Sequence, residues 1–71
     1  MTPAAIIAEL RDIDHRARLI AAHIERMIPD GAGRDDPTWE AHNCAGFAGR
    51  SAEMAWKAMT KAVRETMGGR Q

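Results

Sequence analysis

Apolar residues recur along the first third of the chain at alternating steps of four and three. The positions are Ile6, Leu10, Ile13, Ala17, Ile20, Ile24 and Met27. Such a heptad repeat is typical of a helix that packs one stripe against another helix. Thr2 followed by Pro3 favours a helix start, because threonine caps helices and proline fits the first turn. Pro29 disfavours helical backbone at Ile28, so the first helix is predicted to end there.

A second heptad stripe follows, and it consists almost entirely of alanine. Its positions are Ala41, Ala45, Ala48, Ala52, Ala55, Met59, Ala62 and Thr66. Asp36 followed by Pro37 predicts the start of a second helix, and Gly68 with Gly69 predicts its end. The chain is therefore predicted to be one helical domain over residues 1–71, composed of helix 3–28, loop 29–36, helix 37–67 and a short tail 68–71.

Folding the two helices into an antiparallel hairpin brings the large residues of the first stripe opposite the alanines of the second. Met27 then lies opposite Ala41, and the same register extends to Ile6 and Ala62 at the other end. Large residues opposite small ones interdigitate at native packing density. We therefore predict an all-α fold, an antiparallel two-helix hairpin with an alanine-rich heptad seam.

Gly46 and Gly49 are the weak point of the second helix, since each costs about 1 kcal/mol relative to alanine in a helix interior. A break at these glycines would give a three-helix bundle instead of a hairpin. The alanine stripe passes through both glycines without a change of phase, which favours one continuous helix.

Further apolar residues flank the predicted seam and have no place inside a two-helix fold. They are Ile7, Ala21, Ile28, Phe47, Met54, Trp56 and Val63. An apolar face of this size is typical of an interaction surface. Two hairpins stacking into a four-helix bundle would cover it, as would a different partner protein. We therefore expect these residues to form a partner or dimer interface, with the Trp56 ring as its anchor.

Composition and charge narrow the classes of function. Ten basic residues balance ten acidic ones, so no overall field draws the chain to nucleic acid or to a membrane. Hydrophobic residues make up 45% and charged residues 28%, a globular balance and not a disordered one. No apolar run of about 18 residues and no secretory signal is visible. A single cysteine, Cys44, cannot form an internal disulfide, and we expect a cytoplasmic protein.

The residues that could bind a metal or catalyse a reaction form no recognised pattern. The three histidines and Cys44 match no zinc spacing, and the acidic residues of the loop do not follow the spacing of a calcium site. Cys44 lies opposite His23 in the hairpin, but nothing orients that imidazole as a base, and two packed helices offer little concavity. We expect no enzymatic activity, no metal and no cofactor.

Four basic residues on the second helix form a stripe, called here the basic stripe. They are Arg50, Lys57, Lys61 and Arg64. Such a stripe could follow a phosphate backbone, and a dimer would double it. Glu53 and Glu65 are spaced to pair with two of these residues, so a solvated helix face is the simpler interpretation. The paired-helix pattern also resembles the helical-hairpin dimer of the repressor-of-primer RNA-binding protein, and that resemblance implies RNA as a partner.

The sequence therefore favours a small, non-enzymatic protein-interaction module that acts by binding the surface of a partner protein or of a second copy. Alanine- and arginine-rich chains of this size are common among phage and mobile-element inhibitors, such as anti-CRISPR proteins, and such an inhibitor is one form that the module would take. The first alternative is a dimeric hairpin that binds RNA or DNA along the basic stripe. The second is a structural or assembly subunit.

Overall fold

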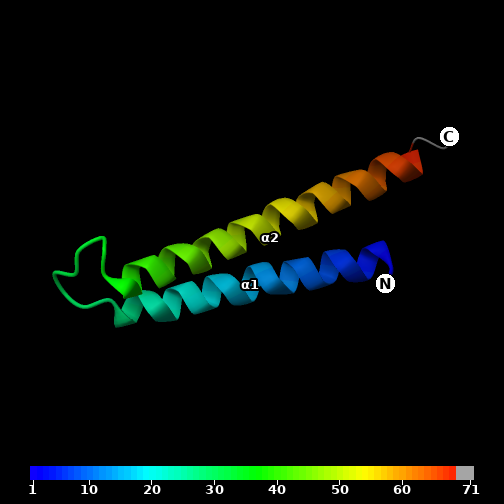
Figure 1. Cartoon of the computed structure of the whole chain (residues 1–71). Coiled ribbons are helices and arrows are strands. Elements are labelled where there is room, and N and C mark those ends of the chain that lie inside the picture. Colours follow the sequence, from blue (N-terminus) through cyan, green and yellow to red (C-terminus); the bar gives the residue numbers. More distant parts are fainter. Residues whose placement is uncertain (69–71) are drawn as a thin grey trace.

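The chain forms two long helices joined by a loop, in a computed structural model that describes residues 1–68. Helix α1 spans Pro3–Met27 and helix α2 spans Pro37–Gly68. They run antiparallel, side by side, in a rod of 59 × 17 × 14 Å, and the end of α2 extends beyond the start of α1 (Figure 1). The predicted all-α hairpin is confirmed. The predicted tail lies, from residue 69 onward, outside the described residues.

The helix ends follow from local capping chemistry. The Thr2 hydroxyl accepts a hydrogen bond from the Ala5 N–H at 3.1 Å. The Asp36 carboxylate accepts one from the Thr38 N–H at 2.8 Å and another from the Thr38 hydroxyl. The bond from the hydroxyl and, to a smaller extent, the bond from the N–H hold the pKa of Asp36 below its ordinary value of 3.8. Each cap therefore satisfies an N–H of the first turn that has no partner within the helix.

The loop reverses the chain through two hydrogen-bonded turns. The Ala32 N–H donates to the Pro29 carbonyl at 3.1 Å, and the Asp36 N–H donates to the Gly33 carbonyl at 3.0 Å. Gly31 lies in the first turn with φ of +80°, a left-handed conformation that glycine adopts without a steric cost. The second turn delivers Asp36 to its capping position.

Helix α2 is continuous through its two interior glycines, so the three-helix alternative is not adopted. A Cβ atom built at Gly49 would lie 3.1 Å from Arg18 Cγ and 3.6 Å from Ala17 Cβ. A Cβ atom at Gly46 would meet nothing within 4 Å. Gly49 is thus a point of close approach between α1 and α2, whereas Gly46 has no comparable packing role.

On both helices, every second position of the seam lies one residue later in the chain than the sequence predicts. The seam is formed on α1 and the residue after it by Ile7, Leu10, Asp14, Ala17, Ala21, Ile24 and Ile28, and on α2 by His42, Ala45, Gly49, Ala52, Trp56, Met59 and Val63. From the predicted seam, Ile13, Ile20 and Met27 are instead 49%, 53% and 69% exposed. The predicted phase is therefore wrong, although alternate positions are shared.

Two contacts on one side of the hairpin explain this rotation. The Trp56 indole N–H donates to the Asp14 carboxylate at 3.0 Å, which joins α2 to α1 across the seam. The absent side chain of Gly49 lets α2 approach the Asp14 carbonyl oxygen, which a Cβ atom there would meet at 3.5 Å. Both contacts bring the helices together along the line that contains Asp14, and turn Ile13 outward.

Candidate interaction surfaces

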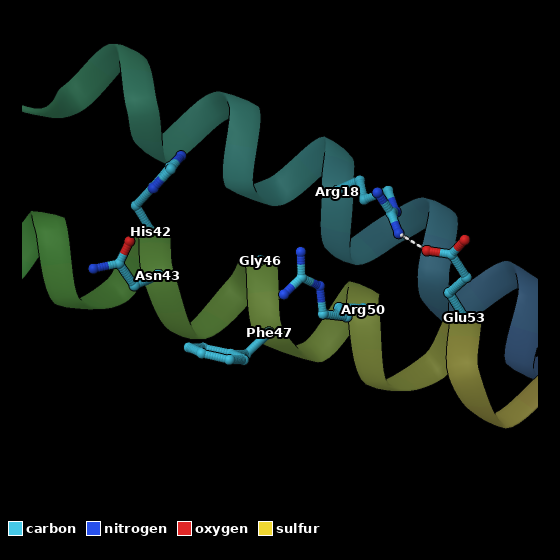
Figure 2. A pocket seen from close by; sticks show the side chains of 7 residues that line it. All are labelled: Arg18, His42, Asn43, Gly46, Phe47, Arg50 and Glu53. Atoms are coloured by element: carbon cyan, nitrogen blue, oxygen red, sulfur yellow. Dashed lines mark hydrogen bonds and ion pairs between the residues drawn. The ribbon is translucent and has the colours of Figure 1, made fainter.

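Ion pairs bridge one edge of the hairpin around Trp56, called here the network edge. The Arg18 guanidinium donates to Asp14 one turn earlier on α1 and, at 2.5 Å, to Glu53 of α2 (Figure 2). Glu53 also accepts from the Lys57 ammonium at 2.7 Å. The network gives Asp14 two charged or polar donors, and this explains how an acidic residue is accommodated in the seam.

The network fixes the charge states of its members. The hydrogen bond from Arg18, followed by the one from Trp56, holds the pKa of Asp14 below its ordinary value of 3.8. The hydrogen bond and the charge of Lys57 lower the pKa of Glu53 in the same way. The Asp14 carboxylate in turn raises the pKa of Arg18. All these groups are therefore ionised at neutral pH and serve as links between the helices.

Trp56 is engaged within the hairpin. Its ring is half-buried in the seam and lies under two cations, with the Arg11 guanidinium carbon 5.0 Å and the Lys57 ammonium 5.7 Å from the ring centroid. Such cation–π contacts stabilise a partly exposed ring. Trp39 lies edge-on to His42, with ring centroids 5.7 Å apart, and shares with Ile28 a hollow near the loop.

The structure divides the predicted interface residues into two groups. The half-buried group, in the seam, consists of Ile7, Ala21, Ile28, Trp56 and Val63. Phe47 and Met54 are 66% and 67% exposed. Figure 2 shows Phe47 on the side of α2 that is turned away from α1. These two side chains form an outward apolar pair, and contact of any of the seven residues with a partner stays a prediction.

A second apolar surface, called here the apolar face, lies on the side of the hairpin opposite the network edge. It consists of Ile6, Ile13, Ile20 and Met27 from α1 and Ala41, Ala48, Ala55 and Ala62 from α2. On each helix these residues recur at every seventh position, immediately before a seam residue. Equivalent positions of an antiparallel pair lie on the same side of the seam, so the two rows run next to each other.

The heptad stripes predict that these eight residues make an apolar contact, but place that contact inside the hairpin. The missed signal is that apolar residues occupy about three positions in seven on α1, which is wider than one helix–helix seam requires. At one end of the face Ala62 lines a hollow together with Pro3, Met59, Val63 and Thr66. Within the apolar face Ile13, Ile20 and Met27 are about half exposed or more, whereas Ile6 and Ala55 are half-buried.

The basic stripe is exposed along α2, but half of its charges have acidic partners. Lys57 pairs with Glu53, and the Lys61 ammonium lies 4.0 Å from the Glu65 carboxylate. Arg50 lines a shallow hollow that also contains Arg18, His42 and Asn43 (Figure 2). The Nδ1 atom of His42 is buried there without a hydrogen-bond partner.

The residues considered for metal binding form no metal site within the described part of the chain. Cys44 and His23 are both exposed on their helices. Within residues 1–68 no group of three histidine, cysteine or acidic side chains is placed to hold a metal ion. Over the same residues neither helix has a stretch long and apolar enough to cross a bilayer.

Comparisons with protein-family models, with curated proteins and with solved structures gave no match to this chain.

Proposed function

We propose that this protein is a non-enzymatic interaction module that acts by packing exposed apolar helical surface against another protein. The supporting observation is how little apolar surface the hairpin covers by itself. In the part of the chain that the structure describes, Ala52 is the only buried hydrophobic residue, whereas Ile20, Met27 and Phe47 are more than half exposed. Exposed apolar surface such as the row that contains Ile20 and Met27 marks sites of protein–protein contact.

Pairing of two hairpins into a four-helix bundle is the simplest way to cover this surface, because it needs no second gene product. A different protein that presents its own helices would cover it as well. An inhibitor of the anti-CRISPR type and an assembly subunit are both forms of this proposal. Size and composition alone support the inhibitor form.

Binding of RNA or DNA along the basic stripe is the second candidate. Its support is that all four basic side chains are exposed on α2. Neutralisation of Lys57 and Lys61 by neighbouring glutamates leaves Arg50 and Arg64 as the cations without an acidic partner among the described residues. Phosphate binding gains its affinity from several unpaired cations, so this candidate has the weaker support.

The proposed function is tested by site-specific photocrosslinking in the cells that make the protein. A photoreactive residue replaces Ile20 on the apolar face or, as a matched control, Arg26, which is exposed on the outer side of α1. We expect a protein adduct of one defined mass from position 20 and none from position 26. Absence of a protein adduct at position 20, or equal adducts at both positions, would contradict the proposal.

A further inference from the structure

We propose that the apolar face is covered by a second copy of this chain, related by a twofold axis that runs along the hairpin. In this arrangement α1 of each copy packs against α2 of the other, and two hairpins form a four-helix bundle. The inference rests on the proposed function and names its partner. It is supported by the heptad pattern, by the shape of the face, and by the surface area of the hairpin.

The heptad pattern indicates a bundle larger than one hairpin. The seam inside the hairpin includes Asp14, His42 and Gly49, which are poor choices for an apolar contact. The unbroken apolar repeat of α1 instead combines seam residues such as Leu10 with residues of the apolar face such as Ile13. A stripe that includes both the seam residues and the residues of the apolar face covers about three positions in seven on the helix. In a four-helix bundle, each helix turns a stripe of this width toward the bundle axis.

The shape of the apolar face is complementary to itself. α1 contributes a row of isoleucine and methionine side chains, and α2 contributes an adjacent row of alanines with the same seven-residue spacing. A twofold interface uses the same patch on both copies, so every large residue needs a small one on the partner. An axis along the hairpin keeps each height unchanged and exchanges the two helices. It therefore places Ile20 against Ala48 of the second copy and Ile13 against Ala55.

The other twofold arrangement, with its axis across the hairpin, fits the side chains less well. It would place α1 on α1 and α2 on α2. Isoleucine would then meet isoleucine, and alanine would meet alanine. The contact of isoleucine with isoleucine would be overpacked, and the contact of alanine with alanine would leave empty space. Both cost free energy. The row of large residues beside the row of small ones thus favours the axis along the hairpin.

The accessible surface of the hairpin is larger than a monomer of its mass normally exposes. It amounts to 5702 Å² for a chain of 7.8 kDa. A folded monomer of this mass exposes about 4,400 Å², so the excess is about 1,300 Å² per chain. Removal of this excess from both copies corresponds to about 2,600 Å², which falls in the range of obligate homodimers.

The charges around the apolar face also permit a second copy. The formal net charge of the chain is zero, so two copies do not repel each other at long range. The residues that border the alanine row on the outer side of α2 are Cys44, Ser51, Ala58 and Glu65, all of them exposed, and the first three are small and uncharged. A helix of the second copy can therefore approach this side of α2 closely.

The first test compares two neighbouring substitutions by light scattering. Ile20→Asp places a charge on the apolar face, and Leu19→Asp places one on the outer side of α1 at a residue of similar exposure. We expect Ile20→Asp to raise the dimer dissociation constant by roughly a hundredfold or more, since twofold symmetry removes the buried side chain twice. Leu19→Asp should leave the dimer intact. Equal effects of the two changes would overturn the proposal.

The second test does not depend on the stability of a charged variant. In a Cys44→Ser background, protein with Arg16→Cys is mixed with protein with Ser51→Cys and oxidised. These positions border the face on α1 and on α2, and the proposed axis sets them side by side in different copies. We expect disulfides between the two variants. Disulfides that form instead within the Arg16→Cys protein alone would overturn the axis, because it places the two α1 helices diagonally.

The outcomes separate this inference from the proposed function. A wild-type chain that stays monomeric at high concentration, while position 20 crosslinks to a different protein, overturns the second copy and leaves the interaction module standing. A monomer without any protein adduct at position 20 overturns both.

Discussion

Replacement of each interior glycine of α2 by alanine tests the packing of the hairpin most sharply. Both substitutions remove the same propensity penalty, which is about 1 kcal/mol in a helix interior. At Gly46 the new methyl group meets nothing within 4 Å, so Gly46→Ala should increase the free energy of unfolding by about the full 1 kcal/mol. The site thus reports helix propensity alone.

At Gly49 the same gain is opposed by crowding. The methyl group would lie 3.1 Å from Arg18 Cγ and 3.5 Å from the Asp14 carbonyl oxygen, and Arg18 is held in place by its ion pairs. Overpacking of a close contact costs about 1–3 kcal/mol. We therefore expect Gly49→Ala to give no net gain or a loss of up to about 2 kcal/mol.

The assay is thermal unfolding followed by far-ultraviolet circular dichroism, at one fixed protein concentration. A gain of about 1 kcal/mol corresponds to an increase in Tm of roughly 4–8 °C for a chain of this size. The Tm of Gly46→Ala should rise, and that of Gly49→Ala should remain clearly lower. Equal increases in Tm would refute the close approach of α1 and α2 at Gly49. A decrease for Gly46→Ala would show that another surface packs on that position.

Three other predictions follow from the same contacts. The pKa of Asp14 is lower in the folded protein than its ordinary value of 3.8. The contribution of Asp14 to stability is therefore complete above that ordinary value and is lost as the pH falls through the lower pKa of the folded state. Asp14→Asn should therefore weaken the acid dependence of the urea midpoint, and an unchanged dependence would contradict the network. Trp56→Phe keeps the ring but removes the N–H donor to Asp14, and should cost about 1 kcal/mol in urea unfolding; a neutral result would exclude that bond. Ala48→Leu should lower the mass measured by light scattering with little loss of helicity in the monomer, because Ala48 is exposed in the hairpin; a dimer of unchanged affinity would show that the alanine row is not covered.

Local signals in the sequence were sufficient to predict where both helices begin and end. Thr2 and Asp36 each accept a hydrogen bond from the first turn of a helix, and Pro29 lies two residues after Met27, where α1 ends. Capping depends on residues within one turn of each other, so a single sequence contains the whole interaction. The predicted bounds of both helices therefore differ from the structure by one residue at most.

The rotation of each helix could not be predicted in the same way. Ile6 and Ile7, or Ile20 and Ala21, are adjacent apolar residues, and a hydrophobic stripe can be drawn through either member. The choice between them depends on the bond from Trp56 to Asp14 and on the close approach at Gly49. Both connect residues far apart in the chain, so no periodicity within one helix reveals them.

The candidate surfaces were predicted only in part, because they also depend on the rotation of each helix. Phe47 and Met54 lie outside both the predicted and the observed seam of α2. They are therefore exposed in either rotation of that helix, as an interface requires. The alanine stripe predicts a flank position for Trp56, whereas the seam on which Trp56 lies contains the acidic residue Asp14. The indole N–H resolves this conflict by satisfying the carboxylate.

The most direct test of the central claim is the mass of the wild-type chain in solution, measured by light scattering over a concentration series together with the Tm at each concentration. If a second copy covers the apolar face, the mass is about twice the 7.8 kDa of one chain and the Tm rises with concentration, since association stabilises the folded state. A mass of one chain at every concentration, with a Tm that does not change, would contradict that claim.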